Sequence, residues 1–135
     1  MRKKISRVLL VDDDDDANHF QEKIIRKNNF AENIDKAVNG VEALDYLNDC
    51  IKGKHPLPEI IFLDLNMPKM DGWTFLEKYN QLSEEVKSKI TLIILTSSIN
   101  PDDAEKAKKT PEVKGYKNKF LNANQLDEIL KIMPS

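Results

Sequence analysis

The sequence predicts an α/β protein with a doubly wound, five-stranded parallel sheet and helices on both of its faces. Five short apolar runs alternate along the chain with segments in which apolar residues recur at helical spacing. This alternation is typical of a parallel sheet, because parallel strands need a crossover between them. The length of 135 residues suits one domain with a single core, and no repeat or linker interrupts the pattern.

The first strand is predicted at residues 8–11 and is followed by five carboxylates at positions 12–16. The first helix is predicted to run to about residue 28. Carboxylates at the start of a helix cap it and favour its dipole, which accounts for the last three of the five. It does not account for Asp12 and Asp13, which stand at the end of the strand. The apolar stripe of this helix is formed by Ala17, Phe20, Ile24 and Ile25.

The second strand is predicted at residues 34–38, and its polar composition indicates a place near an edge of the sheet. Residues 51–58 are predicted to form a loop that carries a solvated His55. Cys50, the single cysteine, is interpreted as a packing residue near a helix end. The helix before this loop is predicted to bury a stripe of Val41, Leu44 and Leu47.

The third strand, at residues 60–63, is apolar at every position, which is typical of a strand buried on both faces. It ends in Asp64. A carboxylate at the end of a buried strand is costly unless it has a partner or a metal ion. Residues 67–72 cannot continue the strand because they contain a proline and an Asp-Gly turn. In open α/β sheets, chemistry is placed at this carboxyl edge.

The second half repeats the alternation. Residues 84–89 are predicted to be a charged connection, and the start of the helix at residue 101 is marked by Asn100 as a cap and by proline at the first helical position. The third helix is predicted to be capped by Asp71 and is marked by Phe75, Leu76, Tyr79 and Leu82. The other predicted elements are a strand over 90–95 that is followed by Thr96, a helix over 101–109, a lysine-rich strand over 113–119, and a last helix with the stripe Leu126, Ile129, Leu130 and Met133.

Composition excludes several classes of protein. Hydrophobic residues make up 40% of the chain and charged residues 33%, which indicates a globular protein and not a disordered one. The net charge of −2 argues against non-specific nucleic-acid binding. No apolar run approaches the roughly 20 residues that a membrane helix needs. The single cysteine suits a reducing cytoplasm. We therefore expect a cytoplasmic protein without nucleic-acid or membrane partners.

The strand ends carry the residues that phosphoryl transfer needs. Parallel strands present their carboxyl ends at one edge, so Asp12 with Asp13, Asp64, Thr96 and Lys119 should converge. Carboxylates, a backbone carbonyl and water are ligands that suit Mg²⁺. A carboxylate can act as a nucleophile and form an aspartyl phosphate. Mg²⁺, an ammonium and a hydroxyl can then stabilise the charge on the equatorial oxygens.

These residues resemble the receiver domain of two-component response regulators, and the layout is closest to stand-alone CheY-like receivers. The resemblance covers the whole chain and implies a flavodoxin-like (βα)5 fold with strand order 2-1-3-4-5. It also implies one receiver domain over residues 1–135 with no output domain. The motifs that carry it are residues 9–13 (LLVDD), 62–72 (FLDLNMPKMDG) and 94–97 (ILTS), and Gly115-Tyr116 followed by Lys119.

The resemblance implies a role for each matching residue. Asp64 accepts a phosphoryl group from the phosphohistidine of a histidine kinase or a histidine phosphotransfer domain. Asp13 binds Mg²⁺ directly, Asp12 assists through water, and Asn66 contributes its backbone carbonyl. Lys119 pairs with the phosphoryl group. Thr96 supplies the switch hydroxyl, and the ring of Tyr116 changes rotamer when Thr96 moves.

One position departs from the family pattern. Receivers usually carry proline directly after the site lysine, often with a cis peptide bond, and here the residue is Phe120. A cis bond costs about 0.5–1 kcal/mol before proline and about 2.5–4 kcal/mol before another residue. The sequence therefore predicts a trans bond between Lys119 and Phe120, or a strained cis bond.

The leading hypothesis is a signalling module that is not an enzyme acting on a separate substrate: it catalyses its own phosphorylation and dephosphorylation and acts through a downstream protein. A phosphorelay shuttle is the nearest alternative. A second is a Mg²⁺-dependent aspartyl-phosphate phosphatase of the haloacid dehalogenase type. Such an enzyme usually needs an Asp two residues after the nucleophile, where this chain has Asn66. A third is a receiver-like binding module that is never phosphorylated, an alternative that Phe120 keeps open.

Overall fold

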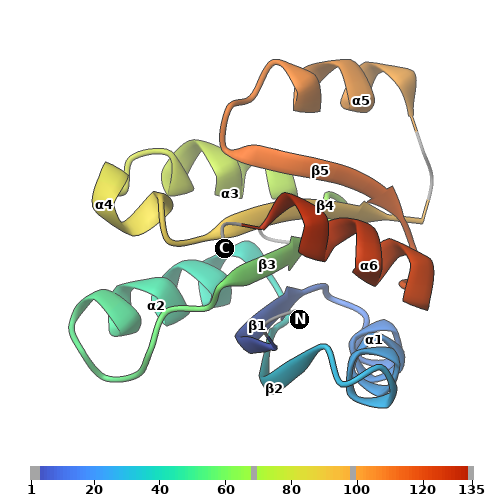
Figure 1. Cartoon of the computed structure of the whole chain (residues 1–135). Helices are drawn as coiled ribbons and strands as arrows, with labels where there is room; N and C mark the ends of the chain where they lie inside the picture. Colours follow the sequence, from blue (N-terminus) through green and yellow to red (C-terminus); the bar gives the residue numbers. More distant parts are fainter. Residues whose placement is uncertain (1–3, 68–69, 98–99, 134–135) are drawn as a thin grey trace.

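The computed structural model describes residues 4–67, 70–97 and 100–133. Five parallel strands form one sheet in the order β2-β1-β3-β4-β5, with helices on both faces (Figure 1). The predicted flavodoxin-like fold and strand order are confirmed. The strands are β1 (Ile5–Val11), β2 (Ala31–Ala37), β3 (Ile60–Leu63), β4 (Thr91–Thr96) and β5 (Val113–Asn118). The helices are α1 (Asp15–Lys27), α2 (Gly40–Ile51), α3 (Gly72–Tyr79), α4 (Glu84–Lys87), α5 (Pro101–Lys108) and α6 (Ala123–Ile132).

Alternating residues of the central strands pack into two hydrophobic cores, one on each face of the sheet. Leu9 and Val11 of β1 pack against α2 and α3, whereas Val8 and Leu10 pack against α1 and α6. All residues of β3 and β4 are buried, as expected for strands that helices cover on both sides. Strand β2 lies at one edge of the sheet, as its polar composition predicts. This burial fixes the carboxyl edge, where the polar strand-end residues lie.

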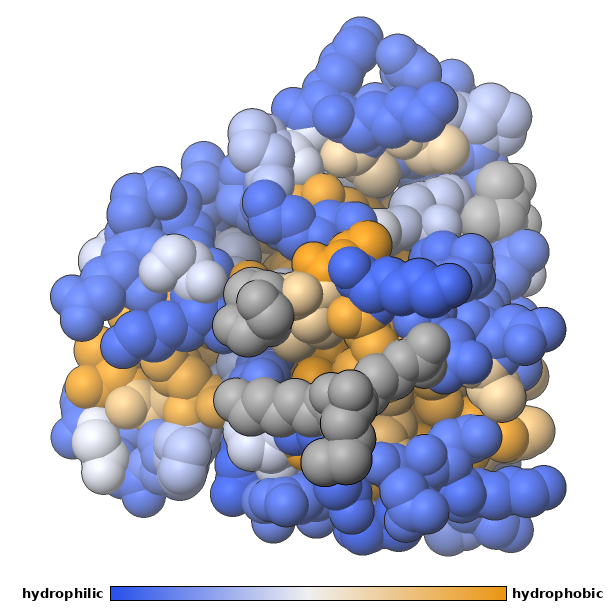
Figure 2. Space-filling model, viewed as in Figure 1, coloured by the Kyte–Doolittle hydropathy of each residue, from blue (hydrophilic) through white to orange (hydrophobic). Residues whose placement is uncertain are grey.

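Helix α5 buries few of its side chains against the rest of the fold. Ala107 is the one buried residue among its eight, all of which the structure describes, and hydrophilic side chains cover the helix at the top of the view in Figure 2. The indole N–H of Trp73 donates a hydrogen bond to Asp103 Oδ1 at 3.1 Å. Lys106 Nζ lies 4.5 Å from the centroid of the Trp73 ring system. Trp73 therefore holds two side chains of α5 against α3.

Several local predictions differ from the structure. Strand β2 begins at Ala31 and not at residue 34, because its backbone pairs with β1 from Ile5 onward. The charged connection over residues 84–89 contains helix α4, whose start is capped by the Ser83 hydroxyl. Val41 is 43% exposed. The predicted stripe of α2 is therefore displaced, and the buried residues of the helix are Gly40, Ala43, Leu47 and Cys50.

His55 is not a solvated loop residue. Its ring lies 4.4 Å from the ring of Tyr46, and Nδ1 lies 3.1 Å from Cys50 Sγ. Cys50 is buried, as predicted, and burial raises the pKa of its thiol to about 11. The thiol is therefore protonated at neutral pH, which agrees with a packing role.

A glycine is required where α3 begins next to Asp64. The Gly72 N–H donates to Leu65 O at 2.9 Å. A Cβ at Gly72 would lie 2.7 Å from Leu65 Cα and 2.9 Å from the Asp64 carbonyl oxygen. These neighbours are backbone atoms, which cannot move aside as the end of a side chain does. The loop over residues 67–72 is described except at positions 68 and 69.

We expect Gly72→Ala to lower the free energy of unfolding by about 1–3 kcal/mol, as overpacking of a tight site does. Urea denaturation measures this loss. Gly115→Ala is the informative comparison, since the nearest atom to a Cβ at Gly115 is Ile93 Cγ2 at 3.4 Å, an ordinary van der Waals contact. An effect at Gly72 no larger than the effect at Gly115 would contradict the packing argument.

Candidate functional site

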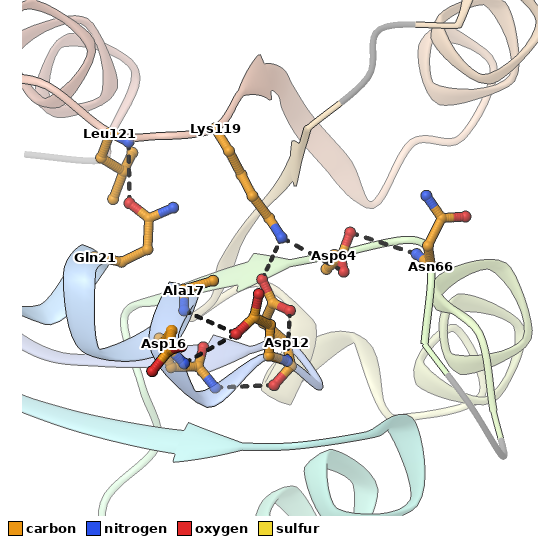
Figure 3. Close-up of polar contacts among 10 residues, drawn as sticks. Asp12, Asp16, Ala17, Gln21, Asp64, Asn66, Lys119 and Leu121 are labelled. Carbon is orange, nitrogen blue, oxygen red and sulfur yellow. Dashed lines mark hydrogen bonds and ion pairs between the residues drawn. The ribbon is translucent and has the colours of Figure 1, made fainter.

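The polar residues predicted at the strand ends meet at the carboxyl edge of the sheet. Asp12 follows β1, Asp64 follows β3, Thr96 ends β4 and Lys119 follows β5. Asp12, Asp64 and Thr96 are buried, with 6%, 6% and 2% of their surface exposed. Figure 3 shows the Lys119 side chain reaching down between Asp12 and Asp64. The convergence predicted for these residues is therefore observed.

Backbone hydrogen bonds hold the site residues one position beyond their strands. The Asp12 N–H donates to Ala37 O at 3.0 Å, and the Asp64 N–H donates to Val11 O at 2.9 Å. The Lys119 N–H donates to Thr96 O at 2.7 Å. The sheet therefore sets the spacing between the two carboxylates and the lysine, because the same ladder that joins the strands continues into the site.

The ammonium group of Lys119 forms ion pairs with two buried carboxylates, those of Asp12 and Asp64. Lys119 Nζ contacts Asp12 Oδ2 directly and lies 3.6 Å from Asp64 Oδ2. Burial lowers the pKa of Lys119, but the hydrogen bond and charge of Asp12, followed by the charge of Asp64, raise it above the ordinary lysine value. Lys119 therefore remains charged. Asp12 is its primary partner, so Asp64 is only partly neutralised.

The pKa of Asp64 is raised from 3.8 to about 6. Burial is the largest cause and the charge of Asp12 is the second, whereas Lys119 and the backbone N–H of Asn66 act in the opposite direction. That N–H lies 3.4 Å from Asp64 Oδ1. Asp64 is therefore deprotonated at neutral pH but is held in an environment that disfavours its charge, which makes it receptive to an electrophile or a cation.

The acidic residues form a group that suits a hard cation. Oxygen atoms of Asp12, Asp13 and Asp64 all lie within 4.8 Å of one another. Asp13 and Asn66 are exposed, so the group opens to solvent on their side. Oxygen ligands of this kind fit Mg²⁺, which keeps several waters in its coordination shell. A hollow of about 550 Å³ lies beside the group and is lined in part by Asp13, Asn66, Trp73 and Asp103.

Tyr116 lies on β5 opposite Ile94 of β4, two residues before Thr96. Its ring is half-buried and its hydroxyl accepts a hydrogen bond from the Asn100 N–H at 3.3 Å. Asn100 caps α5. Tyr116 thus connects the strand next to Thr96 with the start of α5.

Two buried amides on α1 adjoin the site and are absent from the sequence prediction. Asn18 and Gln21 are each 2% exposed. Asn18 Nδ2 donates to the Asp12 carbonyl oxygen at 2.9 Å, and Gln21 Oε1 accepts from the Leu121 N–H at 3.0 Å. The sequence signal is their position: they fall on the buried side of α1 with Ala17 and Ile25, where apolar residues are expected.

A model of the response regulator receiver domain matches residues 8–131. The chain belongs to this family. Receiver domains are phosphoacceptor modules of two-component signalling that act with histidine kinases and downstream targets, and they bind Mg²⁺ at acidic residues.

Individual receivers support the assignment. A two-component response regulator from Cytophaga hutchinsonii is 34% identical, with a TM-score of 0.87 over 96% of this chain and 98% of that one. A phosphorylated cyanobacterial phytochrome response regulator, RcpA, is 28% identical with a TM-score of 0.74 over 93% and 89% of the two chains.

Among curated proteins, the probable methanogenesis regulatory protein FilR2 of Methanothrix harundinacea (strain 6Ac) is 32% identical over 100 residues. The match covers 74% of this chain and 63% of FilR2. The chain thus spans less than two thirds of the length of that relative. No helix in the part of the receiver that the structure describes is long and apolar enough to cross a membrane.

Of the two alternatives predicted for the bond after Lys119, the trans bond is excluded: the Lys119–Phe120 peptide bond is cis. Contacts flank it on both sides. The Lys119 N–H is bound to Thr96 O, and the Leu121 N–H is bound to Gln21. The Phe120 ring stacks on Phe20 of α1 with 4.8 Å between ring centroids. Phe120 therefore occupies the position of the usual proline without displacing Lys119 from the acidic group.

Proposed function

We propose that this chain is a response regulator that accepts a phosphoryl group on Asp64 from the phosphohistidine of a histidine kinase or a histidine phosphotransfer domain. The observation that carries the proposal is the position of Asp64 within one group with Asp12, Asp13 and Lys119. Its carboxylate is ionised at neutral pH because its pKa is about 6. We propose one receiver domain over residues 1–135, acting in the cytoplasm through a downstream protein.

In the proposed reaction, an oxygen of the Asp64 carboxylate attacks the phosphorus atom. The new O–P bond forms as the P–N bond to the donor imidazole breaks, and the electron pair of that bond leaves with the nitrogen. Water later attacks the phosphorus atom of the aspartyl phosphate, the O–P bond to Asp64 breaks, and inorganic phosphate leaves as the carboxylate is restored. The solvent-open side at Asp13 and Asn66 gives the donor a path to Asp64.

Each neighbouring residue has a proposed part. Asp12, Asp13, Asp64 and the backbone carbonyl of Asn66 would hold Mg²⁺, which neutralises charge on the transferred group. Lys119, now bound to Asp12, would contact one phosphoryl oxygen and the Thr96 hydroxyl another. A phosphoryl group adds about −1.5 to −2 charges and three acceptor oxygens. That change would draw Thr96 toward the site, and the Tyr116 ring would follow.

The phosphatase alternative is less well supported by the site. Asn66 stands two residues after the nucleophile, and an amide cannot donate and accept the proton that such an enzyme moves during turnover. The first product of the proposed chemistry is the phosphorylated protein itself, which water hydrolyses in a later step.

Incubation with acetyl phosphate and Mg²⁺, followed by intact mass measurement, tests the proposal. We expect one added phosphoryl group on the wild-type protein and on Asp45→Asn, a matched change at an exposed aspartate of α2. We expect none on Asp64→Asn, and none on the wild type after chelation of the metal. A wild-type protein without an adduct after rapid quenching would instead indicate a binding module.

A further inference from the structure

A small cavity lies directly behind the acidic site. It is lined by Asp12, Asn18, Gln21, Asp64 and Lys119 together with apolar side chains of the sheet, and it leaves about 10 Å³ for the centre of a water molecule. That volume is about what one water needs, provided that polar partners are available. The cavity therefore has room for one water molecule between the Asn18 and Gln21 side chains and the acidic site.

Two polar atoms beside this cavity are buried without a hydrogen-bond partner among residues 4–67, 70–97 and 100–133. They are Asn18 Oδ1, an acceptor, and Gln21 Nε2, a donor. A buried polar group without a hydrogen-bond partner is costly, so native proteins rarely leave two such groups beside one cavity. One water can donate to the first and accept from the second, and it retains one further donor for a carboxylate.

The second polar atom of each amide side chain is hydrogen-bonded to the backbone at or near a site residue. Asn18 Nδ2 holds the carbonyl of Asp12, and Gln21 Oε1 holds the N–H of Leu121, two residues after Lys119. Phe20, next to Gln21, stacks on Phe120. Figure 3 shows Gln21 bound to Leu121 above α1, with its amide nitrogen turned to the side on which Lys119 lies. Helix α1 thus fixes both Asp12 and the turn after Lys119.

We propose that Gln21 and Asn18 are positioning residues for Lys119, and that the cavity between them holds one water that bridges the two amides and the acidic site. The assignment rests on the proposed function only where it concerns the rate of phosphorylation. During phosphoryl transfer, the Lys119 ammonium must leave Asp12 and contact the phosphoryl group. Because α1 holds the turn after Lys119 at a fixed distance from Asp12, the ammonium stays within reach of that group.

The kinetic test compares Gln21→Met with Gln125→Met. Gln125 also anchors β5, because its Nε2 donates to Asn118 O at 3.2 Å, but it does not line the cavity. We expect Gln21→Met to lower the maximal rate of phosphorylation by acetyl phosphate about tenfold, with the half-saturating donor concentration unchanged. We expect Gln125→Met to change the maximal rate less than twofold. Equal rates for the two variants would overturn the positioning role.

A double-mutant cycle separates positioning from general damage to the fold. If Gln21 acts through Lys119, Gln21→Met changes the residual rate of Lys119→Met by less than about twofold, since coupled residues are not additive. A further tenfold loss in that background would indicate a merely structural effect. Both variants are compared at a temperature at which urea denaturation shows them to be folded.

The water is tested without any activity measurement. In a crystal structure of the wild-type protein at about 1.5 Å resolution or better, we expect an ordered water within hydrogen-bond distance of Asn18 Oδ1 and Gln21 Nε2, and in Gln21→Met we expect its loss. A dry cavity in the wild type would overturn the water site. If the wild type takes up no phosphoryl group, the proposed function fails while this structural test still stands.

Discussion

Lys119→Met is expected to lower the free energy of unfolding at pH 7.5, without Mg²⁺, by about 3–5 kcal/mol, the usual cost of removing one partner of a buried ion pair. Only 10% of the Lys119 side chain is exposed, and its partner Asp12 is exposed by 8%. Removal of the ammonium leaves two buried carboxylates facing each other. Urea denaturation measures the loss, and added Mg²⁺ should restore part of it because the same carboxylates would bind the ion.

The matched control for this change is Lys117→Met. Lys117 lies on β5, two residues before Lys119. Its side chain is 27% exposed, and its Nζ lies 3.6 Å from Glu128 Oε1 in a more exposed ion pair. Exposed pairs contribute about 0–1 kcal/mol. If the two variants lose the same stability, Lys119 is not the counter-ion of the buried site.

Asp64→Asn is expected to stabilise the folded protein at pH 7.5. The fold raises the pKa of Asp64 from its ordinary value of 3.8 to about 6, so the folded state binds the proton more tightly than the unfolded state. The stability that this proton contributes is present in full below pH 3.8 and is lost as the pH rises through 6. The loss is at most about 3 kcal/mol, from about 1.4 kcal/mol per pK unit.

Urea denaturation from pH 4 to pH 8 is the measurement. We expect the stability of the wild type to fall relative to that of Asp64→Asn between pH 4 and 6.5, and we expect the variant to be more stable by about 1–3 kcal/mol at pH 7.5. Asp45→Asn, a change at an exposed position of α2, is the matched control. Parallel curves for the wild type and Asp64→Asn would show that the fold does not disfavour the Asp64 charge.

The parts of the fold that depend on hydrophobic pattern could be predicted from the sequence. The runs over residues 8–11 and 60–63 are apolar at every position, and the structure buries them on both faces. Their parallel arrangement follows from the helices between them. The convergence of Asp12, Asp64, Thr96 and Lys119 follows in turn, because all four stand at the same end of parallel strands.

Features that depend on contacts across the fold could not be predicted in this way. The pairing of Lys119 with Asp12 depends on the distance between β1 and β5, which no local pattern encodes. The position of His55 against Tyr46 depends on how a loop folds back onto α2. Asn18 and Gln21 are amides on a helix face that otherwise contacts a core, so their roles appear only when Asp12 and Leu121 are placed beside them.

The contact between Trp73 and α5 gives the protein a built-in optical reporter. The chain has a single tryptophan, so all indole fluorescence comes from the junction of α3 and α5. Its ring is bounded by a hydrogen-bonded carboxylate at Asp103 and by the ammonium of Lys106, and both groups belong to the helix that has a single buried residue. A movement of α5 away from α3 therefore changes the environment of the indole directly. The emission spectrum will follow that movement in real time, without an attached dye.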